Sequence, residues 1–169
     1  EVMGLPEKAI RYHERILEID PLHEASLDAL EKLYEDAERF GELAALLERR
    51  LETALDDEAV DIRLYLARLY LDQLLVPERA LGHVEEILKS RSDDADAREL
   101  AERMLEIGSL KRRVALLLEG VREARDEVKN LVRMLEIHLE YVEESDVEQR
   151  AAILRRIAEL RDERLSDDE

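Results

Sequence analysis

The chain repeats itself along its length. A shift of 71 residues places the segment that begins at Pro6 on the segment that begins at Pro77. The residues of the first copy that recur include Pro6, Glu7, Ala9, Glu14, Ile16, Leu17, Ala44, Leu46, Leu47 and Glu48. A shift of 36 places Leu30, Leu33 and Tyr34 on Leu66, Leu69 and Tyr70. A period of about 35 residues is the length of one helical hairpin, so the chain is predicted to be a series of hairpins.

The hydrophobic pattern is helical almost throughout. Apolar residues recur every three or four positions, as on one face of an α-helix, and no segment alternates like a strand. Only 5 Gly and 3 Pro argue against a turn-rich β protein. Ser145, with Glu148 three residues later, has the form of a capping box for the last helix. We therefore expect an all-α fold of nine antiparallel helices, at 6–18, 23–38, 41–55, 58–75, 77–90, 94–107, 110–125, 128–143 and 146–164.

Two segments carry the features of a known repeat family. One is Leu66-Ala67-Arg68-Leu69-Tyr70 followed by Pro77-Glu78-Arg79-Ala80-Leu81; the other is Pro6-Glu7-Lys8-Ala9-Ile10 running on to Ile19-Asp20-Pro21. They resemble the small-residue and Tyr positions of the first helix of a tetratricopeptide repeat, the Ala of its second helix and its closing Pro. No Trp opens a first helix, so the resemblance is to a divergent, bacterial-type array.

The resemblance implies an α-α superhelical solenoid that covers residues 1–169 as a single domain. It would consist of one trailing helix and four hairpins, with an acidic tail after them: 6–20, 22–56, 58–91, 93–126, 128–164 and 165–169. Another α-α solenoid is the alternative fold. The chain begins as if inside a structural unit, so we expect it to be a fragment of a longer protein.

The net charge of −18 narrows the choice of partners. A strongly acidic chain repels phosphate backbones and anionic lipid, so neither nucleic acid nor a membrane surface is expected to bind it. No apolar run approaches the roughly 20 residues that span a bilayer. The acidic start, Glu1-Val2-Met3, is unlike a signal peptide, which favours a soluble, cytoplasmic protein. The absence of Cys fits a cytoplasm and a periplasm equally well.

Residues for catalysis or metal binding are not evident in the sequence. His13-Glu14 and His23-Glu24 begin like a zinc-protease signature, but no second His follows at the required spacing. The six Ser residues lie at predicted helix ends or faces and none has the glycine neighbours of a nucleophile elbow. We therefore expect no enzyme activity, no catalytic residue, no metal and no cofactor.

Two functions fit this architecture. The resemblance implies a protein–protein interaction module or scaffold that binds a peptide or a helix of a partner protein in a concave groove, lined by the first helix of each hairpin. The alternative is a structural spacer or self-assembly segment of a larger repeat protein, with no ligand of its own.

The candidate groove residues form a basic ladder. Lys32, Arg68 and Arg103 occupy equivalent places in three hairpins, with rungs expected about 10 Å apart, one helix-packing distance. They would bind carboxylates of an extended peptide, while nearby acids would bind its basic side chains: Asp28, Asp61, Asp72 and Asp96. Alternatively, the three bases are ordinary solvated residues paired with Glu31, Glu35, Asp72 or Glu106. The carboxylate-binding Lys and Asn pattern of the family is not reproduced, so no specific ligand carries over.

The lack of a ligand set leads to a first prediction. A chelator such as EDTA should leave the melting temperature unchanged, because a structural metal would contribute folding free energy that chelation removes. Differential scanning calorimetry with and without chelator checks this, and a lowered melting temperature would show that a metal site exists.

Overall fold

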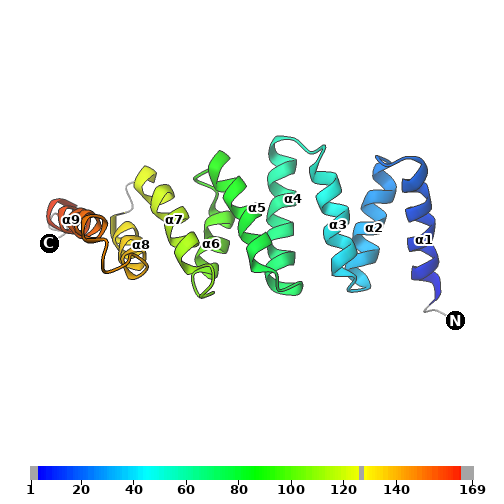
Figure 1. The fold of residues 1–169 in the computed structure, drawn as a ribbon. Helices are drawn as coiled ribbons and strands as arrows, with labels where there is room; N and C mark the ends of the chain where they lie inside the picture. The colour runs from blue at the N-terminus through cyan, green and yellow to red at the C-terminus, as the bar shows by residue number, and fades with distance from the viewer. Residues whose placement is uncertain (1–3, 126–127, 165–169) are drawn as a thin grey trace. The chain divides into compact units, whose positions relative to one another are not determined.

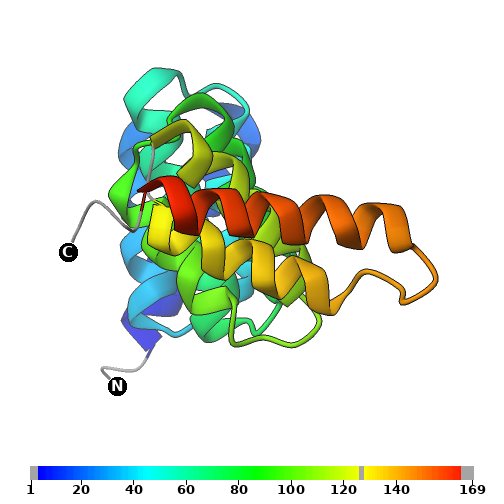
Figure 2. The same cartoon turned by 90° about the vertical axis from the view of Figure 1, so that its left-hand side faces the viewer.

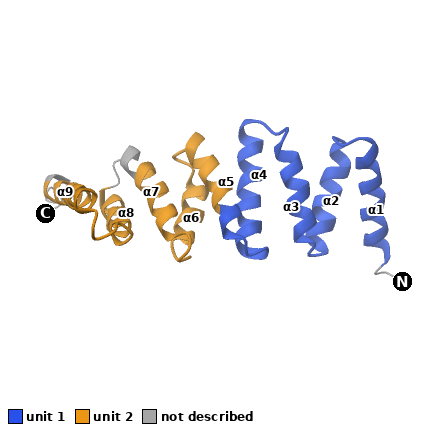
Figure 3. Ribbon diagram, in the orientation of Figure 1, with its two compact units in different colours: residues 1–80 blue, residues 81–169 orange. Residues whose placement is uncertain are grey.

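The computed structural model describes residues 4–125 and 128–164 of the chain (Figure 1). Over these residues it contains nine α-helices, one π-helical turn and no strand, so the prediction of an all-α protein is confirmed. The predicted tail at 165–169 lies outside the described residues. The chain divides into two compact units, one up to Ala80 and the other from Leu81 (Figure 3). Whether they form a single domain stays a prediction.

Unit 1 contains four helices and the start of a fifth. They are α1 (Gly4–Ile19), α2 (Glu24–Asp36), α3 (Phe40–Leu51), α4 (Asp56–Arg68), the π-helix η1 (Leu69–Gln73) and the beginning of α5 (Pro77–Ser90). Helices that follow one another in sequence also pack against one another: α1 on α2, α2 on α3 and α3 on α4. The segment predicted as one α-helix over 58–75 is instead an α-helix that ends in a π-helical turn.

Unit 2 contains the remainder of α5 and four more helices. These are α6 (Ala95–Met104), α7 (Lys111–Arg125), α8 (Val128–Glu140) and α9 (Val147–Arg164). Here too α6 packs on α7, α7 on α8 and α8 on α9. Figure 2 shows α8 and α9 side by side, joined by the turn at 141–146. The start of α9 differs from the predicted capping box, because the Gln149 amide donates to Asp146 at 3.0 Å while the Ser145 hydroxyl donates to Glu143.

Within each unit, buried aliphatic side chains pack the helices together. In unit 1, Leu30, Leu43, Leu47, Leu66 and Ala67 are at most 1% exposed. Unit 2 has an equally buried set: Leu81, Val84, Ile87, Ala101, Met104 and Leu118. A further cluster joins α8 to α9 and consists of Leu131, Val132, Leu135, Val142, Ile153, Ile157 and Leu160. These apolar side chains are thus covered by neighbouring helices.

Hydrogen bonds between helices recur at the repeat period. In unit 1 the Tyr34 hydroxyl donates to Glu14 at 2.8 Å, and the Tyr70 hydroxyl donates to Glu48 at 2.8 Å. A guanidinium covers each ring, Arg39 at 5.0 Å from the Tyr34 centroid and Arg79 at 5.2 Å from that of Tyr70. Two similar sets of contacts are therefore centred on tyrosines that the 36-residue shift aligns in the sequence.

Unit 2 uses the glutamates that the 71-residue shift aligns with Glu14 and Glu48. Glu85 of α5 accepts from the Arg113 guanidinium of α7. Glu119 of α7 lies with its Oε2 atom 3.2 Å from Nδ1 of His138 on α8. The glutamate is therefore kept at the same repeat position in both units while its partner changes.

Burial predicts how strongly individual leucines contribute to stability. Leu66 is completely buried, whereas Leu33 is only half-buried. Leu66→Ala should therefore lower the free energy of unfolding by about 2–5 kcal/mol, since it removes buried methyl groups and leaves a cavity. Leu33→Ala should cost clearly less. Urea unfolding followed by circular dichroism measures both, and equal losses would mean that this assignment of the inner face is wrong.

Candidate functional site

The residues of the predicted basic ladder are all exposed. Lys32 lies in α2, Arg68 at the end of α4 and Arg103 in the last turn of α6. The first two belong to unit 1 and the third to unit 2. Their exposure allows contact with a ligand, and the ladder itself stays a prediction.

The predicted acidic residues are exposed as well, and Asp28 is paired within the chain. Asp28 accepts from the Arg50 guanidinium at 3.0 Å, and the same guanidinium contacts Glu31 at 2.9 Å and Glu58 at 3.8 Å. The other three acids lie on the surfaces of α4, η1 and α6: Asp61, Asp72 and Asp96. None of the seven predicted residues lines any of the three cavities described next.

The largest of these cavities lies in unit 1 and has a volume of about 550 Å³. Residues of α1, α2 and α3, with the α1–α2 turn, surround it. Its apolar lining consists of Leu17, Pro21, Leu30, Tyr34, Ala45 and Leu46, and its charged lining of Glu14, Glu18, Glu42 and Arg49. This size and this mixture of an apolar floor with a few charges are typical of binding sites.

Neighbouring side chains hold the carboxylates of the cavity in place. Glu14 accepts from Tyr34, and Glu18 accepts from Arg15 at 2.8 Å. Glu42 accepts from Arg39 Nε at 2.9 Å, and this hydrogen bond lowers the pKa of the Glu42 carboxyl. Three carboxylates against one guanidinium leave the cavity lining net negative. It is therefore suited to a cation.

A second cavity of about 200 Å³ continues from the first. The two share Pro21 and Arg49, and the second extends to Thr53 and Glu58 near the start of α4. In unit 2 a separate cavity of about 390 Å³ has the opposite charge balance, with Lys111 and Arg133 against Glu106. The two unit 1 cavities are neighbours with a shared wall at Pro21 and Arg49, so one extended segment could reach both.

A serine near the cavity has two imidazole neighbours. Ser26 Oγ lies 3.1 Å from His13 Nδ1 and 3.0 Å from His23 Nδ1, and His23 also caps α2 by accepting from the Ser26 amide. A serine nucleophile must reach its substrate, but Ser26 is 0% exposed. The arrangement therefore serves to hold α1 against α2.

Metal binding and membrane insertion are two further possibilities for the described part of the chain. No group of three or more His, Asp or Glu residues there could hold a metal ion. Within the same residues, no helix is both long enough and apolar enough to cross a membrane.

The cavity was missed because its lining comes from three consecutive helices, and the sequence pattern does not specify how they pack. The prediction placed the groove on the first helix of each hairpin, whereas α1 and α3 correspond to second helices in that scheme and provide all of the charged lining. One signal was available in the sequence, since the 71-residue shift aligns Glu14 with Glu85. A glutamate that recurs on an otherwise apolar helix face indicates an interhelical contact.

Comparisons with known proteins add no assignment to this site. No protein-family model matches the chain, and a search of curated proteins gives no match.

The phenol of Tyr34 provides a test of the cavity wall at alkaline pH. Burial and the hydrogen bond to Glu14 raise the pKa of Tyr34 from 10.0 to about 12. The folded state therefore keeps a proton that the unfolded chain loses above pH 10, so the contribution of Tyr34 to stability should decline between about pH 10 and 12.

The matching variant is Tyr34→Phe. At neutral pH it should lower the free energy of unfolding by about 0.5–1.5 kcal/mol, the net value of one hydrogen bond. Its deficit relative to the parent chain should shrink as the pH rises towards 12 in urea unfolding experiments. Tyr12→Phe, at a side chain that is 68% exposed, serves as the control. If the stability deficit of Tyr34→Phe stays constant over this pH range, the folded state does not raise the pKa of Tyr34.

Proposed function

We propose that the chain is a protein-interaction module whose unit 1 cavity binds a basic, partly apolar segment of a partner protein. The observation that carries this proposal is the lining of the cavity, in which three carboxylates surround a floor of leucines. A cation with an apolar stem matches both parts of that lining. A Lys or Arg side chain has this form.

The chemistry of such a side chain fits the cavity in detail. Its methylene groups would pack against Leu17, Leu30 and Leu46, while its charge would reach Glu14 or Glu18. Both carboxylates already accept one hydrogen bond, but a carboxylate has about four lone-pair sites and can accept more. Hydrogen bonds between charged groups are about twice as strong as neutral ones.

The two neighbouring cavities suggest how the rest of the segment would run. From the first cavity an extended peptide would pass Pro21 and Arg49 into the second, where Leu22 and Leu27 provide apolar contacts. Arg49 would then face a carboxylate or a carbonyl of the peptide. The exposed Lys32 and Arg68 of the predicted ladder are additional candidates for acidic side chains of the same ligand.

We further propose that the hairpins form an α-α solenoid similar to the tetratricopeptide repeats. Support comes from the sequence period of about 35 residues, from sequential packing of helices within each unit and from the matched contacts of Tyr34 and Tyr70. Repeat arrays of this kind present extended binding surfaces, which agrees with the proposed role.

Peptide binding tests the function directly. The probes are fluorescent peptides with one central Arg between leucines, compared with the same peptides carrying neutral citrulline. Fluorescence anisotropy should detect saturable binding of the Arg peptides, and Glu18→Arg should weaken it about tenfold or more, equivalent to at least 1.4 kcal/mol.

Glu38→Arg is the matched control, because Glu38 is an exposed acid in the turn after α2 and does not line the cavity. It makes the same change in net charge and should leave the affinity nearly unchanged. If the citrulline peptides bind equally well, or if both variants weaken binding equally, the cavity is not the site of recognition.

A further inference from the structure

Helix α1 has an apolar stripe that no part of the described chain covers. Leu5, Tyr12 and Ile19 are 64%, 68% and 81% exposed. They follow one another at intervals of seven residues, which places them along one line of the helix. Contiguous exposed apolar side chains of this kind mark an interaction surface more often than isolated ones do.

The repeat shows that this side of the helix is suited to packing. The 71-residue shift aligns α1 with α5, where Ala80, Val84 and Ile87 are each 0% exposed. The equivalent residues of α1, next to the apolar stripe, are only half-buried: Ala9, His13 and Ile16. The side of the helix that is fully buried in α5 is therefore only partly buried in α1.

Three bases border the exposed stripe of α1. Lys8, Arg11 and Arg15 lie at spacings of three and four residues, so they share one side of the helix. Arg15 contacts Glu18 at 2.8 Å, and all three bases are exposed. In a chain of net charge −18, a local cluster of three bases beside apolar residues favours an acidic partner.

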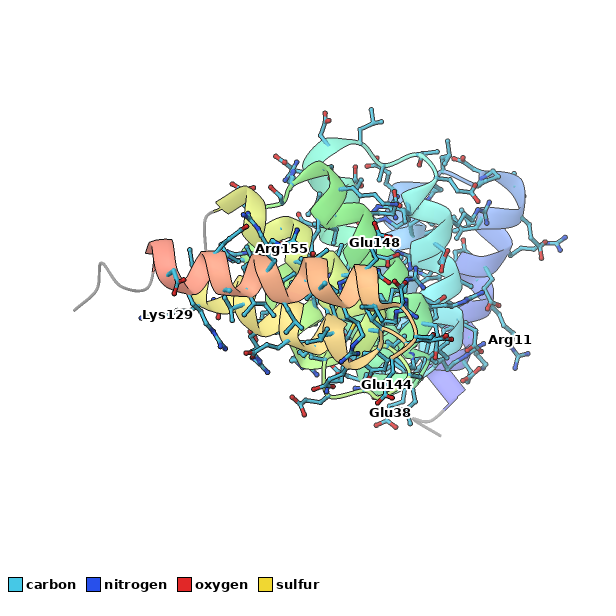
Figure 4. The ribbon with its side chains drawn as sticks, turned by 60° about the vertical axis from the view of Figure 1, so that its left-hand side comes forward. Arg11, Glu38, Lys129, Glu144, Glu148 and Arg155 are labelled. Atoms are coloured by element: carbon cyan, nitrogen blue, oxygen red, sulfur yellow. The ribbon has the colours of Figure 1, made fainter. Side chains whose placement is uncertain are left out.

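Helix α9 carries a second uncovered stripe with acids at its beginning. Val147 and Leu154 are 70% and 50% exposed, again seven residues apart, and Ala151 is exposed between them. Glu144 lies in the turn before the helix and Glu148 in its first turn. Figure 4 labels Glu144, Glu148 and Arg155 in this region and Arg11 on α1.

We propose that the α1 stripe of one copy of this chain binds the α9 stripe of a second copy, head to tail. The charges favour a parallel pairing, which brings Glu144 and Glu148 to Lys8 and Arg11. An antiparallel pairing would place Arg155 near Arg11. Pairing two α1 stripes would bring bases to bases.

This contact has consequences for assembly. It joins two different surfaces, so a dimer keeps one free α1 stripe on one copy and one free α9 stripe on the other and can add further copies. Two single-helix faces form a small interface, and such interfaces are weak. The association is therefore expected at micromolar to millimolar concentration and decreases as salt screens the charges. It uses the outer side of α1 and does not depend on the unit 1 cavity.

Sedimentation equilibrium of the chain of residues 1–169 tests the proposal. The mean mass should rise with concentration, and Tyr12→Ser/Ile19→Ser or Val147→Ser/Leu154→Ser should each abolish the rise. A mixture of these two variants should form a one-to-one dimer, because it retains one intact α1 stripe and one intact α9 stripe. Leu55→Ser, at a side chain that is 76% exposed but outside both helices, is the control and should associate like the parent chain.

Charge exchange provides a second readout. Lys8→Glu/Arg11→Glu and Glu144→Lys/Glu148→Lys should each abolish association, and the variant that combines all four changes should regain it. Circular dichroism verifies that each variant is folded. A chain that stays monomeric up to millimolar concentration, an α1 variant that still associates, or a four-fold variant that stays monomeric would each overturn the proposal.

Discussion

An amphipathic helix needs a neighbour for every apolar side it presents, and this requirement accounts for most of the structure. Helix α4 is buried on several sides, at Val60, Ile62, Leu64, Leu66 and Ala67. Helix α1 has only Ile10 and Leu17 buried. Burial of aliphatic surface stabilises a helix only where another element excludes water. The two helices therefore differ in the number of neighbours that cover them. The order in which successive helices pack follows from the same requirement.

Hydrogen bonds at fixed repeat positions define how the helices align. A buried phenol has to find an acceptor, and Tyr34 and Tyr70 find theirs on the preceding helix of unit 1, at Glu14 and Glu48. Apolar packing alone tolerates sliding of one helix along another, whereas a hydrogen bond to one carboxylate does not. The glutamates therefore supply a register that the leucines leave open. In unit 2, Glu119 has the equivalent role with His138 as its partner.

The two proposed interaction surfaces lie on different sides of α1. Glu14, Leu17 and Glu18 line the cavity, whereas Leu5 and Tyr12 lie on the outer stripe. The charges differ in the same way, with acids towards the cavity and bases beside the stripe. One helix can therefore attract a cationic segment on one side and an acidic helix on the other, since each charge acts mainly within a Debye length of about 8 Å.

The sequence alone determined the helical class, the hairpin period and most helix positions, because these depend on local spacing of apolar residues. The range 77–90 agrees with the structure at both ends, whereas 58–75 ends in the π-helix η1, and the ranges 41–55, 94–107 and 128–143 run three or four residues past the ends of α3, α6 and α8. The tertiary structure decided which faces are covered, and it alone located the cavity lined by Glu14, Tyr34 and Leu46. Periodicity reports which side of a helix is apolar. It does not report how many neighbours reach that side, so burial at Leu66 and exposure at Ile19 became distinguishable only once the helices were packed.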